Sequence, residues 1–393
     1  MFLDYTDEQR ALRKELREYF DALLTPEVRE ELGPPGEGNA KFRDVVRKMG
    51  ADGWLGIGWP KEYGGQGRGT LDQFVFFDEV QRAGAPFPFV TINTVGPTIM
   101  TYGSEEQKRE FLPGILSGDI NFAIGYTEPE AGTDLASLRT RADDDGDEWV
   151  INGNKVFTSG ANQADYIWLA CRTDPDAPKH KGISIIIVPT SSPGFKCTPI
   201  VTVGSVVTQA SYYDDVRVPK SNVVGDVNTG WRLITNQLNH ERVGLAALGG
   251  TTHRLYDDMV QWCRDTPSGD GSQRMIDVPW VQMDLAKAHA KLEAMKLLNW
   301  RMAAAVANDT LTPTDASAAK VFGVETQIDA YRLFLGILGA VGYLPHGSAG
   351  SALLGDVERM GRSAQINTFG GGVVEVLREI VATTGLGMVR SGR

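Results

Sequence analysis

Two short segments of the chain concentrate the hydroxyl groups and glycines that could bind a polar ligand. The first covers residues 123–137 and includes Tyr126, Thr127, Gly132 and Thr133. The threonine hydroxyls can donate hydrogen bonds. A turn at Gly132 would let backbone N–H groups come close to a ligand, because glycine has no Cβ. The composition therefore indicates a possible ligand loop, although a purely structural role for this segment alone stays open.

The second segment covers residues 152–159, which read NGNKVFTS. Phe157 supplies an aromatic ring, and Thr158 and Ser159 supply hydroxyls next to it. The pair at Asn152 and Gly153 is typical of a turn between two strands. Taken by itself, this segment also fits ordinary strand and turn residues.

One carboxylate stands out in the second half of the chain. Residues 239–243 read NHERV, which places Glu241 beside Arg242. A carboxylate in a water-excluded site can act as a general base, because burial raises its pKa. Glu-Arg pairs are also common on helix surfaces, so the residue types alone leave both roles open. His240 points in a different direction from its neighbour on a helix, and we expect it to pack.

Three regions with different residue patterns must position these residues. Residues 1–120 show helical spacing, and a capping box is expected at Thr6 and Gln9. Residues 121–228 contain short runs rich in β-branched residues, bounded by turn residues. Antiparallel strands are expected there, because no helix-length pattern separates the runs. The acidic run at residues 143–148 is expected to form a hairpin turn. Residues 229–393 return to helical spacing and are expected to form a four-helix bundle. One helical stripe is predicted for Leu285, His289, Leu292, Met295 and Met302.

Composition limits the class of protein. The net charge is −11, so neither nucleic acid nor an anionic membrane surface is an expected partner. The three cysteines, Cys171, Cys197 and Cys263, are far apart and form no metal-binding cluster with the five histidines. The N-terminus lacks the pattern of a signal peptide, and no run is long and apolar enough to span a bilayer. A cytoplasmic location is therefore expected.

The first segment resembles the signature of the acyl-CoA dehydrogenase family. Its core, T-E-x-x-A-G-T-D, is matched from Thr127 to Asp134, and the 152–159 segment follows at the family spacing. The resemblance extends over essentially the whole chain. It implies an α+β fold with an N-terminal helical domain (1–120), a middle antiparallel β domain (121–228) and a C-terminal four-helix-bundle domain (229–393).

The resemblance also implies the cofactor and the reaction. By it, Phe157 covers one face of the FAD isoalloxazine, and Ser159 bonds near N5. The remaining cofactor-binding positions implied are Tyr126, Thr127, Gly132, Thr133 and Thr158. The reaction implied is α,β-desaturation of an acyl-CoA thioester, in which FAD N5 takes the β-hydride. Electrons would then pass to electron-transferring flavoprotein.

The base of the reaction departs from the commonest family pattern. Most members carry a C-terminal glutamate in a Y-E-G-T-like pattern, but residues 369–373 read FGGGV here. Aligning Gly372 with the family glycine places Gly371 at the glutamate position. A minority of the family carries the base in an earlier E-R pair, which makes Glu241 the predicted base. Arg242, Gly371 and Gly372 are the predicted substrate-binding residues, and the Gly371 N–H could donate to the thioester carbonyl.

Half of the family's cofactor site is missing from this chain. Homomeric relatives hold the FAD pyrophosphate with R-x-x-F-G and Q-x-x-G-G-x-G elements of a second subunit. Here residues 264–270 read RDTPSGD, and 336–343 read GILGAVGY. Apolar side chains cannot replace a lost amide or guanidinium. The prediction is a heteromer, similar to the base-bearing subunit of actinobacterial α2β2 dehydrogenases that act on sterol side chains. Open alternatives are a homomer with divergent contacts, an acyl-CoA oxidase or flavin monooxygenase, and a non-catalytic subunit.

Overall fold

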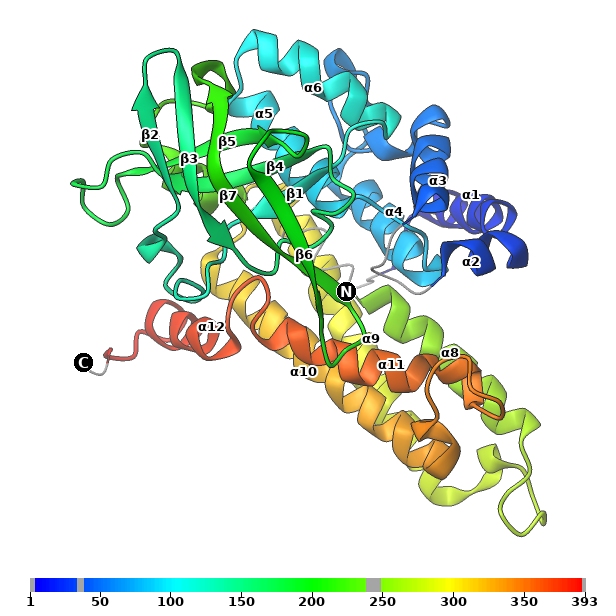
Figure 1. Cartoon of the computed structure of the whole chain (residues 1–393). Helices are drawn as coiled ribbons and strands as arrows, with labels where there is room; N and C mark the ends of the chain where they lie inside the picture. The colour runs from blue at the N-terminus through cyan, green and yellow to red at the C-terminus, as the bar shows by residue number, and fades with distance from the viewer. Residues whose placement is uncertain (1–3, 34–38, 238–248, 391–393) are drawn as a thin grey trace.

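The chain folds in the order helices, sheet, helices (Figure 1). The computed structural model describes residues 4–33, 39–237 and 249–390. The helices of the first region are α1 (Asp7–Leu23), α2 (Pro26–Leu32), α3 (Ala40–Ala51), α4 (Thr70–Ala83), α5 (Gly96–Tyr102) and α6 (Glu105–Ser117). The predicted capping box is confirmed at the start of α1, where Thr6 and Gln9 exchange side-chain and backbone hydrogen bonds.

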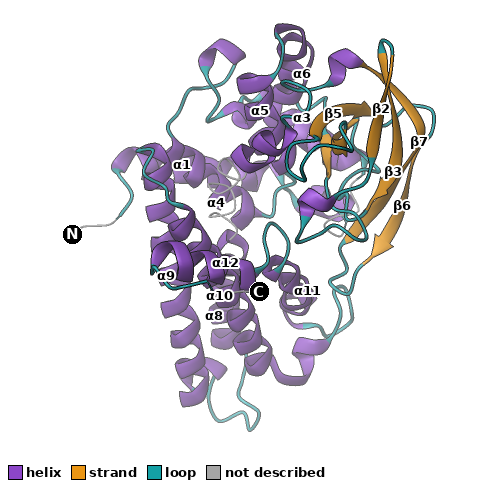
Figure 2. Ribbon diagram, turned by 90° about the vertical axis from the view of Figure 1, so that its left-hand side faces the viewer, coloured by secondary structure: helices purple, strands orange, loops and turns teal. Residues whose placement is uncertain are grey.

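The middle region is a single curved sheet, which Figure 2 shows as a layer along one side of the molecule. The strand order is β1-β4-β2-β3-β7-β6, with β5 paired to β4. The strands are β1 (Phe122–Gly125), β2 (Arg141–Asp145), β3 (Glu148–Lys155), β4 (Tyr166–Arg172), β5 (Ile183–Pro189), β6 (Phe195–Val201) and β7 (Val207–Pro219).

Pairing in this sheet is largely antiparallel, as predicted, with one clear exception. Strand β1 runs parallel to β4, and β2 touches β4 in the parallel sense at one residue pair. The chain leaves β1 through the 126–140 loop and forms the β2–β3 hairpin before β4 returns beside β1. Local alternation of residue types carries no information on the direction of such a distant partner.

The predicted turn at Asn152 and Gly153 is wrong. Strand β3 continues through both residues to Lys155, and its pairing with β7 shifts register between Ile151 and Gly153. A Cβ on Gly153, whose φ is +144°, would lie 2.6 Å from Thr140 Oγ1. The glycine therefore makes a β-bulge where another segment approaches closely. The hairpin turn lies earlier, between β2 and β3, where the acidic run predicted one.

Long helices make up the last region. They are α8 (Gly250–Asp265), α9 (Pro279–Ala307), α10 (Pro313–Leu338), α11 (Asp356–Ser363) and α12 (Val374–Ile380). The first four run side by side in the lower part of Figure 1. In the predicted stripe on α9, His289 is exposed and stacks on Tyr256, while Ala288 takes the buried position. Leu285, Leu292, Met295 and Met302 are buried as expected.

The first and last regions pack directly on each other. Helix α4 contacts α1, α8 and α9, and one apolar core extends from α1 to Ala319 of α10. On α4, the Glu79 carboxylate is almost fully buried and receives Arg13 at 2.8 Å and Arg17 at 2.9 Å. In the described ranges, no helix combines the length and apolar character that crossing a membrane requires. The three cysteines are free, and burial raises the pKa of the Cys171 thiol to about 12.

Candidate functional site

The two segments singled out in the sequence lie side by side. The Val156 N–H donates to Thr127 O at 2.8 Å, and Lys155 Nζ donates to Tyr126 O at 3.1 Å. The first segment leaves the end of β1, and the second leaves the end of β3. Both therefore emerge at one place beside the sheet, although they are distant in sequence.

We call the place where these two segments meet the junction. A buried ion pair holds it together. Lys155 Nζ lies 2.8 Å from Glu128 Oε1, and their side chains are 0% and 7% exposed. Backbone N–H groups of Arg139 and Thr140 also donate to the Glu128 carboxylate, at 2.7 and 2.8 Å. Burial opposes ionisation of Glu128, but Lys155 and the two N–H groups together hold its pKa below the ordinary value. The carboxylate thus closes the loop from 128 to 140.

Sequence reasoning missed the roles of Glu128 and Lys155. Both residues lie inside the two segments. Their pairing could not be predicted, because neither segment indicates which of its residues faces the other segment. The only sequence signal was the presence of one acid and one base within segments expected to be largely buried. The structure shows that this pair shapes the loop, and that the carboxylate of Glu128 is not available to a ligand.

Phe157 is exposed at the edge of this junction. Its φ is +59° and its exposed fraction is 56%. A non-glycine residue in this region of φ is strained and persists only when its surroundings enforce it. Here both neighbours are held, because Val156 N donates to Thr127 O and Thr158 N donates to Gln209 O. The fold therefore presents one aromatic face to solvent at a fixed place.

The hydroxyls beside Phe157 point in different directions. Ser159 is exposed, and its Oγ lies 2.9 Å from Thr208 Oγ1, so it can still meet a ligand. Thr158 is fully buried, with its Oγ1 3.1 Å from Ser211 Oγ. Its backbone N–H donates to Gln209 O and its carbonyl accepts from Ala161 N, so the hydroxyl, the N–H and the carbonyl of Thr158 all bond within the chain.

The loop around Gly132 is open to solvent, whereas the side chain of Tyr126 at its start faces inward. Gly132 and Thr133 are exposed, and a Cβ added to Gly132 would meet only Thr127 Cγ2, at 3.9 Å. The Tyr126 hydroxyl donates to Gln237 Oε1 and accepts from Trp168 Nε1 at 3.1 Å. Tyr126 thus links the loop to the helical residues 230–237, and its backbone lies nearer the junction than its hydroxyl.

The C-terminal glycines form a loop that a lysine of α10 binds. Lys320 Nζ donates to Gly370 O at 2.5 Å and to Gly372 O at 3.1 Å. Gly371 and Gly372 have φ of +69° and +115°, values that side-chain-bearing residues rarely adopt. A glutamate at Gly371 would therefore be strained as well as crowded, since its Cβ would lie 3.3 Å from Lys320 Nζ. No sequence motif indicated a role for Lys320.

The predicted base and its neighbour, Glu241 and Arg242, lie outside the described residues. Gln237 is the last described residue before them, and its Nε2 is buried without a hydrogen-bond partner among the residues that the structure describes. Among the residues that are described, no group of three or more histidines, cysteines or acidic residues could hold a metal ion.

The described part of the junction fits a flat ligand with a polar edge. The exposed ring of Phe157 can cover one face of such a group, and Ser159 and the open loop at Gly132 and Thr133 can meet its edge. A flavin has this shape and these acceptor atoms, so FAD passes the test of fit at these residues. These are among the residues for which the resemblance predicts contacts with the cofactor.

Family models match nearly the whole chain. The models of the acyl-CoA dehydrogenase N-terminal, middle and C-terminal domains match residues 6–119, 123–216 and 228–386, respectively.

Full-length relatives are also found. Acyl-CoA dehydrogenase FadE26 of Mycobacterium tuberculosis is 52% identical over 403 residues, which cover 100% of both chains. A chain of the Tcur3481-Tcur3483 steroid ACAD structure is 62% identical, with a TM-score of 0.95 and 100% coverage of both chains. A chain of the ChsE4-ChsE5 complex from Mycobacterium tuberculosis is 52% identical, with a TM-score of 0.93 and the same coverage.

Proposed function

The chain belongs to the acyl-CoA dehydrogenase family of oxidoreductases, and from this premise we propose that it is an FAD-binding subunit that desaturates an acyl-CoA thioester. The observation that carries the proposal is the contact between Thr127 and Val156, which joins the two family segments beside the exposed Phe157. A sterol-derived acyl group is the proposed substrate class, because relatives of high identity are described as steroid ACADs. The electron acceptor is proposed to be an electron-transferring flavoprotein.

Each residue of the junction has a proposed task. Phe157 covers one face of the flavin ring, and Ser159 donates to its edge. Gly132 and Thr133 present an open loop to the cofactor. When bound, FAD supplies the acceptor for the hydride that leaves the β-carbon. The chain itself supplies the base that removes the α-proton, for which we propose Glu241.

The loop at Gly371 is proposed to bind the thioester. The ammonium group of Lys320 donates hydrogen bonds to the carbonyls of Gly370 and Gly372. These bonds hold the loop in its left-handed conformation. Because the carbonyls of Gly370 and Gly372 bind Lys320, they are not available to the substrate. The N–H of Gly371 is proposed to point toward the substrate carbonyl. Such a donor lowers the cost of developing negative charge on that oxygen.

A paralogous subunit is proposed to complete the cofactor site in an α2β2 heteromer. The region of the missing R-x-x-F-G element is the end of α8 and the loop after it, where Pro267 pairs with Arg274. The missing glutamine position is Gly336, near the end of α10, and it carries no side chain. Support comes from relatives described as two-component assemblies, the Tcur3481-Tcur3483 steroid ACAD and the ChsE4-ChsE5 complex.

Flavin content tests both the cofactor and the heteromer. We expect the chain purified alone to carry almost no FAD by absorbance, and the chain co-purified with its paralogous partner to carry flavin in simple stoichiometric ratio. The reason is that a pyrophosphate needs donors that this chain lacks. Near-stoichiometric FAD in the lone chain would show that the site is complete in a homomer. Absence of flavin from both preparations would contradict the proposed cofactor.

Replacing Phe157 by alanine tests the ring contact. In the flavin-loaded assembly, F157A is expected to weaken FAD binding by about threefold to tenfold, because an aromatic pair contributes roughly 0.5–1.5 kcal/mol beyond its area. The visible absorption band of the flavin should shift as well. Trp280→Ala removes an aromatic side chain of similar exposure, 49%, at the start of α9 and should change neither property. Equal FAD affinity in F157A and the wild type would exclude the stacking role.

A further inference from the structure

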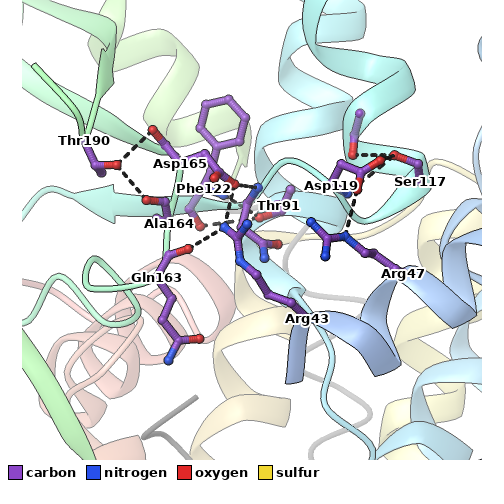
Figure 3. Close-up of polar contacts among 12 residues, drawn as sticks. Arg43, Arg47, Thr91, Ser117, Asp119, Phe122, Gln163, Ala164, Asp165 and Thr190 are labelled. Atoms are coloured by element: carbon purple, nitrogen blue, oxygen red, sulfur yellow. Dashed lines mark hydrogen bonds and ion pairs between the residues drawn. The ribbon is translucent and has the colours of Figure 1, made fainter. Parts of the chain in front are cut away.

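The segment after Phe157 is tied to the N-terminal helical region through one arginine. We infer that Arg43 of α3 is a positioning residue for the flavin-covering segment 157–165, an inference that rests on the function proposed above. Arg43 lies far from this segment in sequence and belongs to none of the family motifs quoted earlier. Its contacts, drawn in Figure 3, are what carry the inference.

Arg43 binds the end of the segment with two charge-assisted hydrogen bonds. Its Nη2 donates to Gln163 O at 2.7 Å and to Asp165 Oδ2 at 2.8 Å. In Figure 3 its side chain extends from α3 toward these two residues. The side chains of Arg43 and Asp165 are only 24% and 33% exposed, so solvent screens the pair less than it screens a surface ion pair.

Asp165 is the point where several elements meet. The same Oδ2 that receives Arg43 accepts the N–H of Asn121 at 2.8 Å, just before β1. The Asp165 N–H donates to Asn121 O at 2.9 Å. At the end of β5, Thr190 donates its N–H to Asp165 O and its Oγ1 to Ala164 O. Two parts of the sheet region and one helix therefore converge on residues 163–165.

The segment between Phe157 and Asp165 is held at both ends. At its start, Thr158 N donates to Gln209 O, and Phe157 keeps its strained φ. Between the ends, the backbone turns on itself, with Ser159 N donating to Phe157 O and Ala164 N to Gly160 O. A strained residue keeps its conformation only while its surroundings enforce it. Removing the hold of Arg43 on the far end should therefore loosen the presentation of the Phe157 ring.

A neighbouring arginine on the same helix provides a matched control. Arg47 lies one turn further along α3 and donates to Asp119 Oδ1 at 2.8 Å, while Ser117 Oγ donates to Asp119 Oδ2 at 2.7 Å. This ion pair is 47% and 58% exposed and links α3 to the residues after α6 rather than to segment 157–165. Figure 3 shows both arginines together. R43M and R47M thus remove the same group from the same helix.

The experiment measures two quantities in each variant. Hydrogen exchange of amides 158–165 is followed in the flavin-free chain, and the FAD dissociation constant is measured in the assembly with the partner subunit. R43M is expected to speed exchange in this segment and to weaken FAD binding about tenfold, whereas R47M does neither. R43K keeps the charge but not both directed hydrogen bonds, so it should restore part of the affinity.

A second variant keeps the test decisive if R43M folds poorly. D165N retains an acceptor for Asn121 N–H while removing the charge that Arg43 meets, so it should reproduce the R43M effects. FAD affinity and exchange equal to those of R47M in both variants would overturn the inference. A wild-type assembly that binds no FAD would instead overturn the proposed function, and the two failures are thereby distinguished.

Discussion

Replacing Glu241 by glutamine is expected to lower the turnover of the assembled, flavin-loaded enzyme by about 10²- to 10⁴-fold, because a positioned general base contributes that much to proton transfer. Glutamine has the size of glutamate but cannot accept the α-proton. The measurement is steady-state turnover of an acyl-CoA substrate with an artificial electron acceptor. Flavin content should match the wild type, which separates loss of the base from loss of the cofactor.

The case for Glu241 rests on the sequence and on what the structure shows at the usual base position. Gly371, which aligns with that position, has a φ of +69° and lies beside Lys320. No carboxylate is available from that residue, which is why we propose a base elsewhere in the chain. The NHERV segment supplies one, in the place where a minority of the family carries it.

Glu375 provides the control for the base prediction. It is the carboxylate nearest in sequence after Gly371, and it is exposed on the first turn of α12. E375Q should therefore keep turnover within about twofold, as expected for a surface substitution. Full activity in E241Q together with a large loss in E375Q would identify Glu375 on α12 as the base instead. Full activity in both variants would favour a non-catalytic subunit.

Replacing Lys155 by methionine is expected to destabilise the chain by about 3–5 kcal/mol, because it leaves the buried carboxylate of Glu128 without its counter-ion. For a chain of this size, the melting temperature should fall by about 5 °C. Methionine replaces the unbranched apolar stem of the lysine side chain, so the loss arises from the ammonium group and its bonds to Glu128 Oε1 and Tyr126 O. Thermal unfolding of the lone chain measures the effect without a contribution from the cofactor.

The pair also predicts a dependence of stability on pH. The pKa of Glu128 is lower in the folded chain than in the unfolded chain, where a glutamate titrates near 4.3. Its contribution to the free energy of unfolding is therefore complete above that value and is lost as the pH falls through the lower, folded value. The stability difference between wild type and E128Q should accordingly narrow as the pH is lowered from about 5 toward about 3.

An exposed pair on the same loop serves as the reference for the buried one. Glu130 lies 2.9 Å from Arg139, with side chains 74% and 81% exposed. E130Q should change the free energy of unfolding by less than about 1 kcal/mol. The double variant E128Q/K155M should be more stable than K155M, since no unpaired charge stays buried. A K155M effect as small as that of E130Q would contradict the importance of the buried pair.

The order of the three regions, the family and several local features could be predicted from the amino-acid sequence. Each of these depends on residues close together in the chain. The capping box needs only Thr6 and Gln9, and the β2–β3 hairpin needs one short acidic run. The loss of a carboxylate at Gly371 was likewise visible from one short motif. Local spacing is informative here because each feature is complete within a few residues.

Contacts between residues far apart in the chain could not be predicted in this way, because they depend on how the elements pack. The pairing of Glu128 with Lys155 and the ties of Lys320 and Arg43 join segments whose local patterns carry no record of each other. The wrong prediction at Gly153 has the same cause: a turn was predicted from the local residues, but a distant strand pairs there and the glycine forms a bulge. Side-chain periodicity reports which face of an element is buried, but what that face contacts depends on how the elements pack. The exposed face of Phe157 is a result of that packing.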